Sequence, residues 1–236
     1  MKAIHDVPLN RRFVQDESGE AKMTAPFWKR CLDILCLLLA APTVVPLMLF
    51  LWGFIKIVSP GPAFFKQERI GLGGKKFLCL KFRSMKVNAD TGVHQSHLKD
   101  LIKADVPMTK MDSKGDSRLI PFGSILRSSG LDELPQLINV LKGDMSLVGP
   151  RPCTPYEYEQ YESWHKQRFN AVPGLTGLWQ VSGKNKTTFK EMINLDIQYA
   201  KRASLWLDIQ IMLKTFPVLF TQIRESRKRN PGENKK

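Results

Sequence analysis

Residues 121–152 read PFGSILRSSGLDELPQLINVLKGDMSLVGPRP, and this stretch decides how the chain is expected to fold. Four of its apolar positions recur at i, i+3, i+4 and i+7, which predicts a short helix with one buried face: Leu134, Leu137, Ile138 and Leu141. Gly143 is a typical residue just beyond the end of such a helix. A smaller helix is predicted to begin at Pro121 and Phe122 and to end near Gly130.

The adjacent carboxylates of Asp132 and Glu133 lie near the start of the predicted helix, where the helix dipole favours the ionised form. Arg127 lies just before the pair, and Arg151 lies just after the helix between two prolines. Acidic and basic side chains around a helix start suit a metal-bound phosphate. They also suit a solvated acidic turn without a chemical role, and this segment alone leaves both interpretations open.

The chain has 236 residues, with 36 Lys and Arg against 22 Asp and Glu, so its formal net charge is +14. A chain of this length can form one domain with an ordinary hydrophobic core. The positive charge predicts an anionic partner, either nucleic acid, an acidic membrane surface or a phosphorylated substrate. The cysteines form no CxxC pair and lack histidines at metal-ligand spacing, which predicts free thiols and no zinc site: Cys31, Cys36, Cys79 and Cys153.

Residues 34–55 form a run of 22 residues without a charge, long enough for a helix to cross a bilayer. This length predicts membrane association. Pro42 and Pro46 stand near the middle, where each removes a backbone donor and favours a kink. Basic residues flank both ends, so the positive-inside rule gives no orientation. A broken, re-entrant helix and a kinked transmembrane helix fit about equally, and Asp33 is expected at the membrane interface rather than in a core.

The next segment, residues 59–87, predicts a β-hairpin that turns at Gly71–Gly74. Lys81 and Arg83 alternate on its second strand and would face the same side, where they would cradle a phosphate if the carboxylates lay nearby. The polar residues 87–117 are expected to form an excursion with a short helix around residues 97–103.

After Pro152 a single helix rich in aromatic side chains is predicted, with these rings packed in a core or at an interface. Residues 172–185 are punctuated by glycines and predict a loop, a class of segment that often binds ligands. The loop carries one cation of interest, Lys184.

Two further helices are predicted towards the C-terminus. The first covers residues 189–203 and carries Asp196. The second covers residues 204–220 and suits either a core or a membrane interface; its apolar face consists of Leu205, Trp206, Ile209, Leu213 and Phe216. The basic tail beyond it would favour an anionic leaflet.

Several motifs in this order resemble those of the bacterial sugar transferases, which are monotopic polyprenyl-phosphate phosphoglycosyl transferases. The resemblance covers roughly residues 29–220. It rests on KRCLDI, the proline-broken apolar run, KFRSM, LRSSGLDELPQLINVLKGDMSLVGPRP and VPGLTGLWQVSGKN.

The resemblance implies transfer of a hexose-1-phosphate from a UDP-sugar to undecaprenyl phosphate, with release of UMP. This reaction begins an exopolysaccharide, an O-antigen or a glycoprotein glycan. Asp132 would be the nucleophile that forms a covalent phosphosugar intermediate, and Glu133 would support the metal, expected to be Mg²⁺, or proton transfer. The remaining expected substrate- and phosphate-binding residues are Lys81, Arg83, Arg127, Arg151, Lys184 and Asp196.

Two positions depart from the family pattern. Members often have Ser-Pro at the break of the membrane helix, whereas this chain has Val45-Pro46, with the hydroxyl of Thr43 nearby. Some members carry Arg in the position of Lys184, and a lysine lacks the planar fork of a guanidinium.

The expected fold is α+β and mostly helical: a polar lead-in (1–25), a re-entrant membrane helix (26–58), a compact cytoplasmic catalytic domain (59–221) with a small β-hairpin and interfacial amphipathic helices, and a basic tail (222–236). The first 25 residues have no apolar core and predict no signal peptide. The expected place is the inner membrane, with the catalytic domain on its cytoplasmic face against anionic lipids. A homodimer is plausible for such an enzyme.

Two other classes of function fit parts of this sequence. A basic, membrane-tethered scaffold without turnover would not need the Asp132–Glu133 pair and its flanking cations. A nucleic-acid-binding protein would account for the charge, but the chain has no stacking-aromatic motif and the apolar run is foreign to that class. No nucleic-acid partner is therefore expected.

Overall fold

The computed structural model describes residues 13–15, 21–86, 107, 118–183 and 187–229. In chain order its elements are β1 (Phe13–Gln15), β2 (Ala21–Met23), α1 (Phe27–Val58), β3 (Phe64–Ile70), η1 (Leu72–Gly74), β4 (Lys76–Phe82), α3 (Gly123–Ser129), η2 (Leu131–Glu133), α4 (Gln136–Lys142), β5 (Ser146–Val148), α5 (Pro155–Glu159), η3 (His165–Asn170), β6 (Gly174–Thr176), α6 (Leu178–Val181), α7 (Phe189–Arg202) and α8 (Leu205–Arg229).

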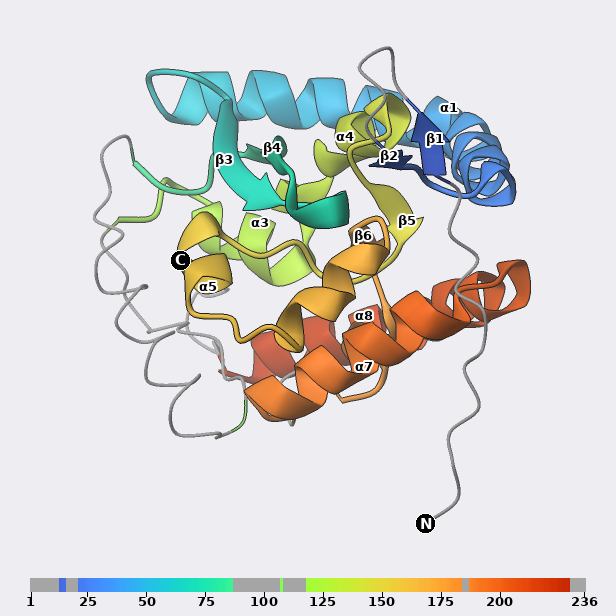
Figure 1. The fold of residues 1–236 in the computed structure, drawn as a ribbon. Coiled ribbons are helices and arrows are strands. Elements are labelled where there is room, and N and C mark those ends of the chain that lie inside the picture. Colours follow the sequence, from blue (N-terminus) through green and yellow to red (C-terminus); the bar gives the residue numbers. More distant parts are fainter. Residues whose placement is uncertain (1–12, 16–20, 87–106, 108–117, 184–186, 230–236) are drawn as a thin grey trace.

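The described part of the chain is mostly helical and has three two-stranded sheets, in agreement with the predicted class. In Figure 1, α1 runs across the top, α7 and α8 lie below, and the β3–β4 hairpin, α3 and α4 lie between them. The basic tail is predicted to begin at residue 222, but α8 continues without a break to Arg229. The helix predicted around residues 97–103, and Lys184, fall outside the described residues.

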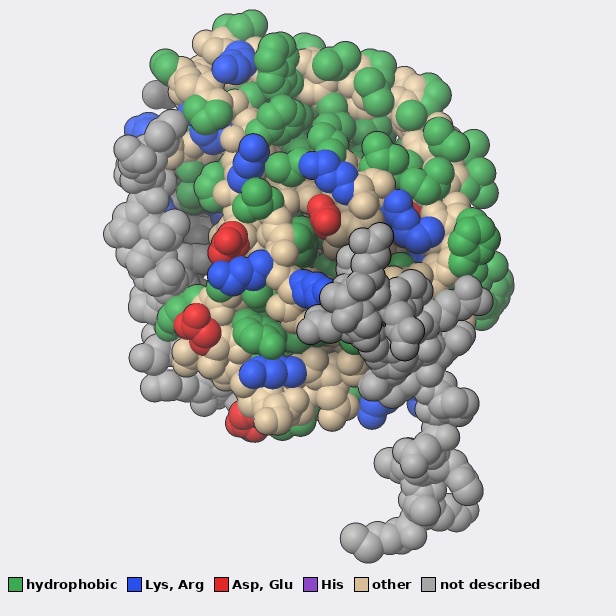
Figure 2. Space-filling model, turned by 45° about the horizontal axis from the view of Figure 1, so that its top comes forward, with side chains coloured by type: hydrophobic (Ala, Val, Ile, Leu, Met, Phe, Trp, Pro, Cys, Tyr) green, Lys and Arg blue, Asp and Glu red, His purple; other side chains and the backbone are tan. Residues whose placement is uncertain are grey.

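Helix α1 exposes its apolar side chains instead of burying them. Its most apolar window has a mean hydropathy of 2.6, yet only 6% of that window is buried, which is the opposite of a core helix. Figure 2, in which the top of the Figure 1 view has come forward, shows hydrophobic side chains gathered along the top and the right edge. Among the described residues, α1 is the one helix long and apolar enough to cross a membrane.

The axis of α1 changes direction along its length, as its ribbon shows in Figure 1. Pro42 and Pro46 lie inside the helix, and a missing backbone donor is a usual cause of such a bend. The hydroxyl of Thr43 donates to the carbonyl of Ala40 at 2.9 Å. By helix numbering the prolines deprive the carbonyls of residues 38 and 42 of their donors, so Thr43 does not compensate for the missing hydrogen bonds.

The first two turns of α1 are held on the body of the protein by buried charges. Lys29 donates to the Tyr199 hydroxyl at 2.8 Å and pairs with Asp208 on α8. Asp33 accepts from the hydroxyl of Ser146 and from the backbone N–H of Leu147, both at 2.9 Å. The prediction of an interfacial Asp33 is wrong, since this side chain is only 1% exposed. It is buried because β5 packs against α1 and supplies two hydrogen bonds to Oδ1 of the carboxylate.

The predicted hairpin is confirmed. Strands β3 and β4 pair antiparallel from Phe64↔Phe82 to Ile70↔Lys76. The outer edge of β4 is completed by one side chain of α4, because Asn139 accepts from the N–H of Leu80 at 2.9 Å and donates to the carbonyl of Leu78 at 2.7 Å. Helix α4 is thereby fixed beside β4.

The predicted buried face of α4 is wrong in part. Leu134 packs against a buried cluster, and Leu137 and Ile138 are half-buried. Leu141, however, is 59% exposed. The fully buried residues of the helix are Gln136, Asn139 and Val140. Asn139 faces the edge of β4, where unpaired backbone groups need partners.

The loop predicted over residues 172–185 is also wrong in part, because β6 pairs parallel with β5 and α6 follows it. A Cβ on Gly174 would lie 2.0 Å from the backbone nitrogen of Gly149, so glycine is required where these segments meet. The helix predicted after Pro152 is split into α5 and η3.

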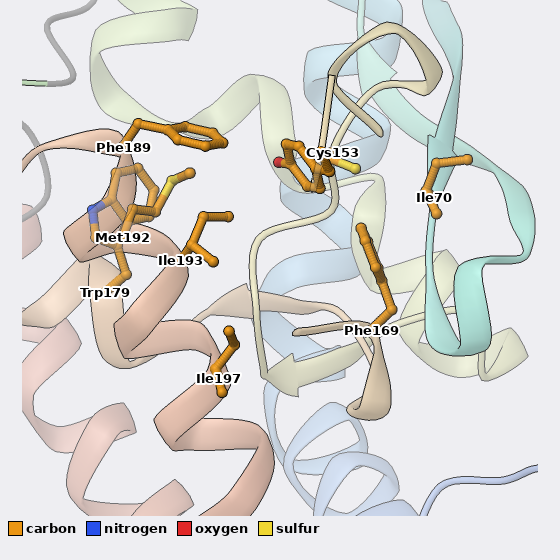
Figure 3. Packing of buried hydrophobic residues seen from close by; sticks show 9 residues of the cluster. Ile70, Cys153, Phe169, Trp179, Phe189, Met192, Ile193 and Ile197 are labelled. Carbon is orange, nitrogen blue, oxygen red and sulfur yellow. The ribbon is translucent and has the colours of Figure 1, made fainter. Parts of the chain in front are cut away.

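The aromatic side chains of this region pack in the core, as predicted. In Figure 3 the labelled side chains of the largest cluster point towards one another from the hairpin, η3, α6 and α7. They are Ile70, Cys153, Phe169, Trp179, Phe189, Met192, Ile193 and Ile197.

Helix α7 matches the predicted helix and begins with a capping box between Thr188 and Glu191. The predicted apolar face of α8 points outwards, with Leu205, Trp206, Leu213 and Phe216 exposed, while Asp208 and Ile211 are buried.

Candidate functional site

The carboxylates of Asp132 and Glu133 lie in the 3-10 turn η2, between α3 and α4. Gly130 ends α3 with a φ of 75°, and its carbonyl accepts from the N–H of Glu133 at 3.1 Å. Helix α4 begins only at Gln136. The pair therefore lies near the start of that helix, as predicted, but on a separate turn that follows the left-handed Gly130 and not in the helix itself.

Two leucines on either side of the pair hold the turn in place. Leu131 and Leu134 pack against a buried apolar cluster that includes Leu51 and Ile55 near the end of α1. The other buried members are Ala63, Phe82, Ile120 and Leu126. The carboxylates are thus carried on a turn anchored to the last turns of the apolar helix.

A cation reaches the pair from the end of β4. The ammonium of Lys81 lies 2.8 Å from Oε1 of Glu133, and the two side chains are 19% and 38% exposed. This contact brings together two predicted site residues that are far apart in the sequence. The ion pair is accessible to solvent on one side, as a site for a soluble substrate must be.

Arg151 follows β5 and is half-buried. Its carbonyl accepts from Arg168 at 2.7 Å, and the residue lines a small cleft together with Glu157 and Trp179. A place for its guanidinium beside the Lys81–Glu133 pair stays a prediction.

Asp196 lies on α7 and is fully buried, where it forms an ion pair with Arg168. Arg168 also donates to the Tyr161 hydroxyl at 2.8 Å and to the carbonyl of Arg151 at 2.7 Å. Asp196 thus acts on the backbone of Arg151 through Arg168, and this geometry does not support a direct contact with substrate.

Burial acts to lower the pKa of Arg168, but Asp196 and Tyr161 outweigh it and raise the pKa above its usual value. The guanidinium is therefore charged in the core. Arg168, Tyr161 and Arg151 line a small cleft whose wall also includes Trp179. Sequence reasoning missed Arg168, because an arginine among aromatic residues resembles many surface positions.

The other predicted cations lie in three different situations. Arg127 is half-buried in the last turn of α3, shortly before the carboxylate pair. Arg83 is only 5% exposed and donates to the carbonyls of Ser59 and Pro60, so it does not share a solvent-facing side with Lys81. Lys184 lies outside the described residues.

The carboxylate pair suits Mg²⁺ better than a metal that needs a full set of protein ligands. Among the described residues, no group of three or more His, Cys, Asp or Glu side chains could hold an ion. Mg²⁺ typically binds through one or two carboxylates together with substrate phosphates and water. Asp132 and Glu133 are the residues that would hold such an ion.

The arrangement as a whole can hold a diphosphate. The Glu133 carboxylate is paired with Lys81, and the turn that carries Asp132 and Glu133 packs on the same cluster as the end of an exposed apolar helix. Cations placed in this way stabilise the charge that develops on phosphoryl oxygens.

Comparison with known proteins shows the family of this chain. The chain is 42% identical to an undecaprenyl-phosphate galactose phosphotransferase of Salmonella typhimurium over 91% of its own length and 44% of that protein's. It is 37% identical to the exopolysaccharide production protein ExoY of Sinorhizobium fredii, over 88% of this chain and 92% of ExoY.

A UDP-glucose:undecaprenyl-phosphate glucose-1-phosphate transferase of Caulobacter vibrioides is 41% identical, over 82% of this chain and 70% of the relative. The chain thus spans less than half of the Salmonella protein and most of ExoY. The family model described as bacterial sugar transferase matches residues 24–222. The chain therefore belongs to the bacterial sugar transferase family.

Proposed function

We propose that the protein transfers a hexose-1-phosphate from a UDP-sugar to undecaprenyl phosphate and releases UMP. One observation carries the proposal: the carboxylate turn, with Lys81 paired to Glu133, is anchored on the same apolar cluster as the end of α1. A soluble nucleotide and a lipid phosphate meet only at a membrane surface. A carboxylate and cation site beside an exposed apolar helix suits that meeting.

In the first step, an oxygen of the Asp132 carboxylate attacks the phosphorus that bears the sugar. A bond forms between this oxygen and phosphorus, and the bond from phosphorus to the bridging oxygen of the diphosphate breaks. UMP leaves with the bridging oxygen and its electron pair. A carboxylate is a competent nucleophile here when neighbouring cations reduce the repulsion between anions.

In the second step, a phosphate oxygen of undecaprenyl phosphate attacks the same phosphorus. The acyl phosphate bond to Asp132 breaks and the carboxylate is regenerated. The product is an undecaprenyl diphosphate sugar, which can begin an exopolysaccharide, an O-antigen or a glycoprotein glycan.

The two carboxylates are proposed to have unequal roles. Glu133 is engaged by Lys81 at 2.8 Å, and a carboxylate already paired with a cation suits a supporting part. Lys81 and Arg151 would bind phosphoryl oxygens, and Arg127 approaches from the turn before the pair. Mg²⁺ held by Asp132 and Glu133 would add positive charge at the diphosphate.

We also propose that α1 re-enters the membrane rather than crossing it, with the rest of the chain on the cytoplasmic face. Both ends of the helix contact the same body: Lys29 and Asp33 at the start, and Leu51 and Ile55 near the end. A helix that crossed the bilayer would separate those ends by about 30 Å of hydrocarbon. Tags at the two termini should both be accessible from the cytoplasm, and protection of only one would establish a span.

The test of the reaction is substitution within the pair. In Asp132→Asn, turnover with UDP-sugar, Mg²⁺ and undecaprenyl phosphate should fall at least about 1000-fold, while membrane association is kept. Glu133→Gln should reduce turnover less. The exposed Glu68 pairs only with Lys76 in the described structure, so Glu68→Gln serves as a surface control and should retain activity.

The covalent step has its own readout. Wild-type protein given UDP-sugar labelled in the sugar and Mg²⁺, without lipid, should retain a labelled phosphosugar on Asp132. Turnover with lipid but no label on the protein would instead establish direct displacement.

The sugar is proposed to be a hexose. Two relatives carry galactose and glucose in their names, so UMP release should be compared for UDP-glucose, UDP-galactose and their N-acetylated forms.

A further inference from the structure

Arg83 closes the end of α1. Its Nη1 donates to the carbonyl of Pro60 at 2.6 Å and its Nη2 to the carbonyl of Ser59 at 2.7 Å. Both carbonyls follow directly after α1, which ends at Val58. The backbone N–H of Arg83 donates to the carbonyl of Ala63 at 2.8 Å, so the chain is held there a third time.

The same short segment also reaches the carboxylate turn. Lys81, two residues before Arg83, pairs with Glu133. Phe82 between them is 1% exposed and belongs to the cluster that contains Leu51 and Ile55 of α1. Three consecutive residues therefore contact the catalytic pair, the apolar face of α1 and the carbonyls at its end.

The carboxylate turn packs against the same apolar cluster. Leu131 and Leu134, which flank the pair, pack on this cluster together with the last turns of α1. The position of the pair relative to α1 thus depends on how firmly the end of α1 is held against Phe82.

We propose that Arg83 is a positioning residue that fixes the end of α1 to the carboxylate turn and acts mainly in the transfer to the lipid. The inference rests on the proposed function and extends it to one half of the reaction. UDP-sugar reaches the turn from water, whatever the depth of α1. The phosphate of the lipid lies at a depth set by the bilayer, so the turn must stand at the matching height, and α1 sets that height.

A direct phosphate contact by Arg83, which the sequence predicts, fits this geometry less well. Its side chain is 5% exposed, and both terminal nitrogens are committed to backbone carbonyls. Reaching a substrate would require it to release two charge-assisted hydrogen bonds.

The experiment separates the two half-reactions in protein reconstituted in nanodiscs. Arg83→Met keeps the apolar length and removes the donors, and Arg83→Lys keeps the charge and one donor direction. Arg69→Met is the matched control, because Arg69 is a buried arginine whose side-chain hydrogen bonds within the described residues go to the carbonyl of Pro152 and the side chain of Gln67.

In Arg83→Met, labelled phosphosugar should form on the protein from UDP-sugar at a rate within about twofold of wild type. Its discharge on addition of undecaprenyl phosphate should slow about 10- to 100-fold, the range that small misplacements cost. Arg83→Lys should recover part of this rate, and Arg69→Met should show no loss confined to the lipid step. An equal fall in both steps, or unchanged discharge, overturns the proposal.

A second readout does not depend on chemistry. Ile57 is 85% exposed in the last turn of α1, so Ile57→Cys, with Cys31 and Cys36 replaced by serine, reports the accessibility of this end to a water-soluble maleimide. Arg83→Met should change the labelling rate, whereas an unchanged rate contradicts the clamp. If wild type traps no phosphosugar, the covalent mechanism fails, while the labelling rate still decides whether Arg83 holds α1.

Discussion

Replacement of Asp196 by asparagine should destabilise the protein, because it removes the charge that compensates a buried guanidinium. Asp196 and Arg168 are 0% and 1% exposed. With Asp196→Asn, Arg168 loses its charged partner and keeps the Tyr161 hydroxyl and the Arg151 carbonyl. Neither of these groups carries a charge of opposite sign.

The magnitude follows from burial. Removing one partner of a buried ion pair typically costs about 3–5 kcal/mol, and the isosteric amide, which can still accept a hydrogen bond, puts this change near the lower end, at about 3 kcal/mol. For a protein of this size, about 1 kcal/mol shifts Tm by about 2–4 °C, so the midpoint should fall by about 6–12 °C.

The double variant Arg168→Met with Asp196→Leu is the decisive comparison. Since apolar side chains can replace a buried ion pair at little cost, this variant should be more stable than Asp196→Asn alone. Unfolding in detergent micelles can be followed by tryptophan fluorescence, because Trp179 is buried in the adjoining cluster. A loss below about 1 kcal/mol for Asp196→Asn, or a double variant at the sum of its single substitutions, would refute a coupled buried pair.

Three further outcomes are expected. Asn139→Ala should cost about 2 kcal/mol, because it leaves backbone groups of β4 without partners, and it should speed hydrogen exchange of the Leu80 amide; unchanged exchange would contradict the edge contact. Burial lowers the pKa of His165, and its Nδ1 accepts a backbone N–H at 3.0 Å. At His165 the folded state therefore binds fewer protons below pH 6.5 than the unfolded state, so the contribution of His165 to stability should fall on acidification below pH 6.5. The pH dependence of stability should differ between wild type and His165→Asn in this range; identical profiles would exclude a contribution from His165. Lys81→Met should change stability by less than about 1 kcal/mol, because its pair with Glu133 is partly exposed, but should lower turnover at least about 100-fold; retained turnover would remove Lys81 from the site.

Elements with local causes could be predicted from the sequence. A long apolar run predicts α1, a glycine turn between alternating strands predicts the β3–β4 hairpin, and helical periodicity predicts α7, because each of these signals acts between near neighbours in the chain. The α4 face could not be predicted in the same way. Its amide side chain at Asn139 completes the edge of β4, and only the packed structure shows that edge to be there.

In the candidate site, too, some features follow from local sequence and others depend on tertiary packing. The pair Asp132–Glu133 is recognisable from its motif, and the structure brings Lys81 to Glu133, as expected. The motif does not show that Lys81 and Arg83 have different roles, because the two cations stand in one short sequence. In the structure Arg83 binds carbonyls just after α1, whereas Lys81 pairs with Glu133.

By itself, the sequence determined that the protein has one long apolar helix and a β-hairpin. It also determined, through its motifs, the family to which the protein belongs. Only the tertiary structure decided which charged groups are buried and what they hold: Asp33 fastens the start of α1, Arg83 its end, and Asp196 the arginine behind Arg151. The physical reason is that burial of a charge is tolerated only where a partner compensates it. Those partners come from distant segments of the chain, so no local pattern reveals them.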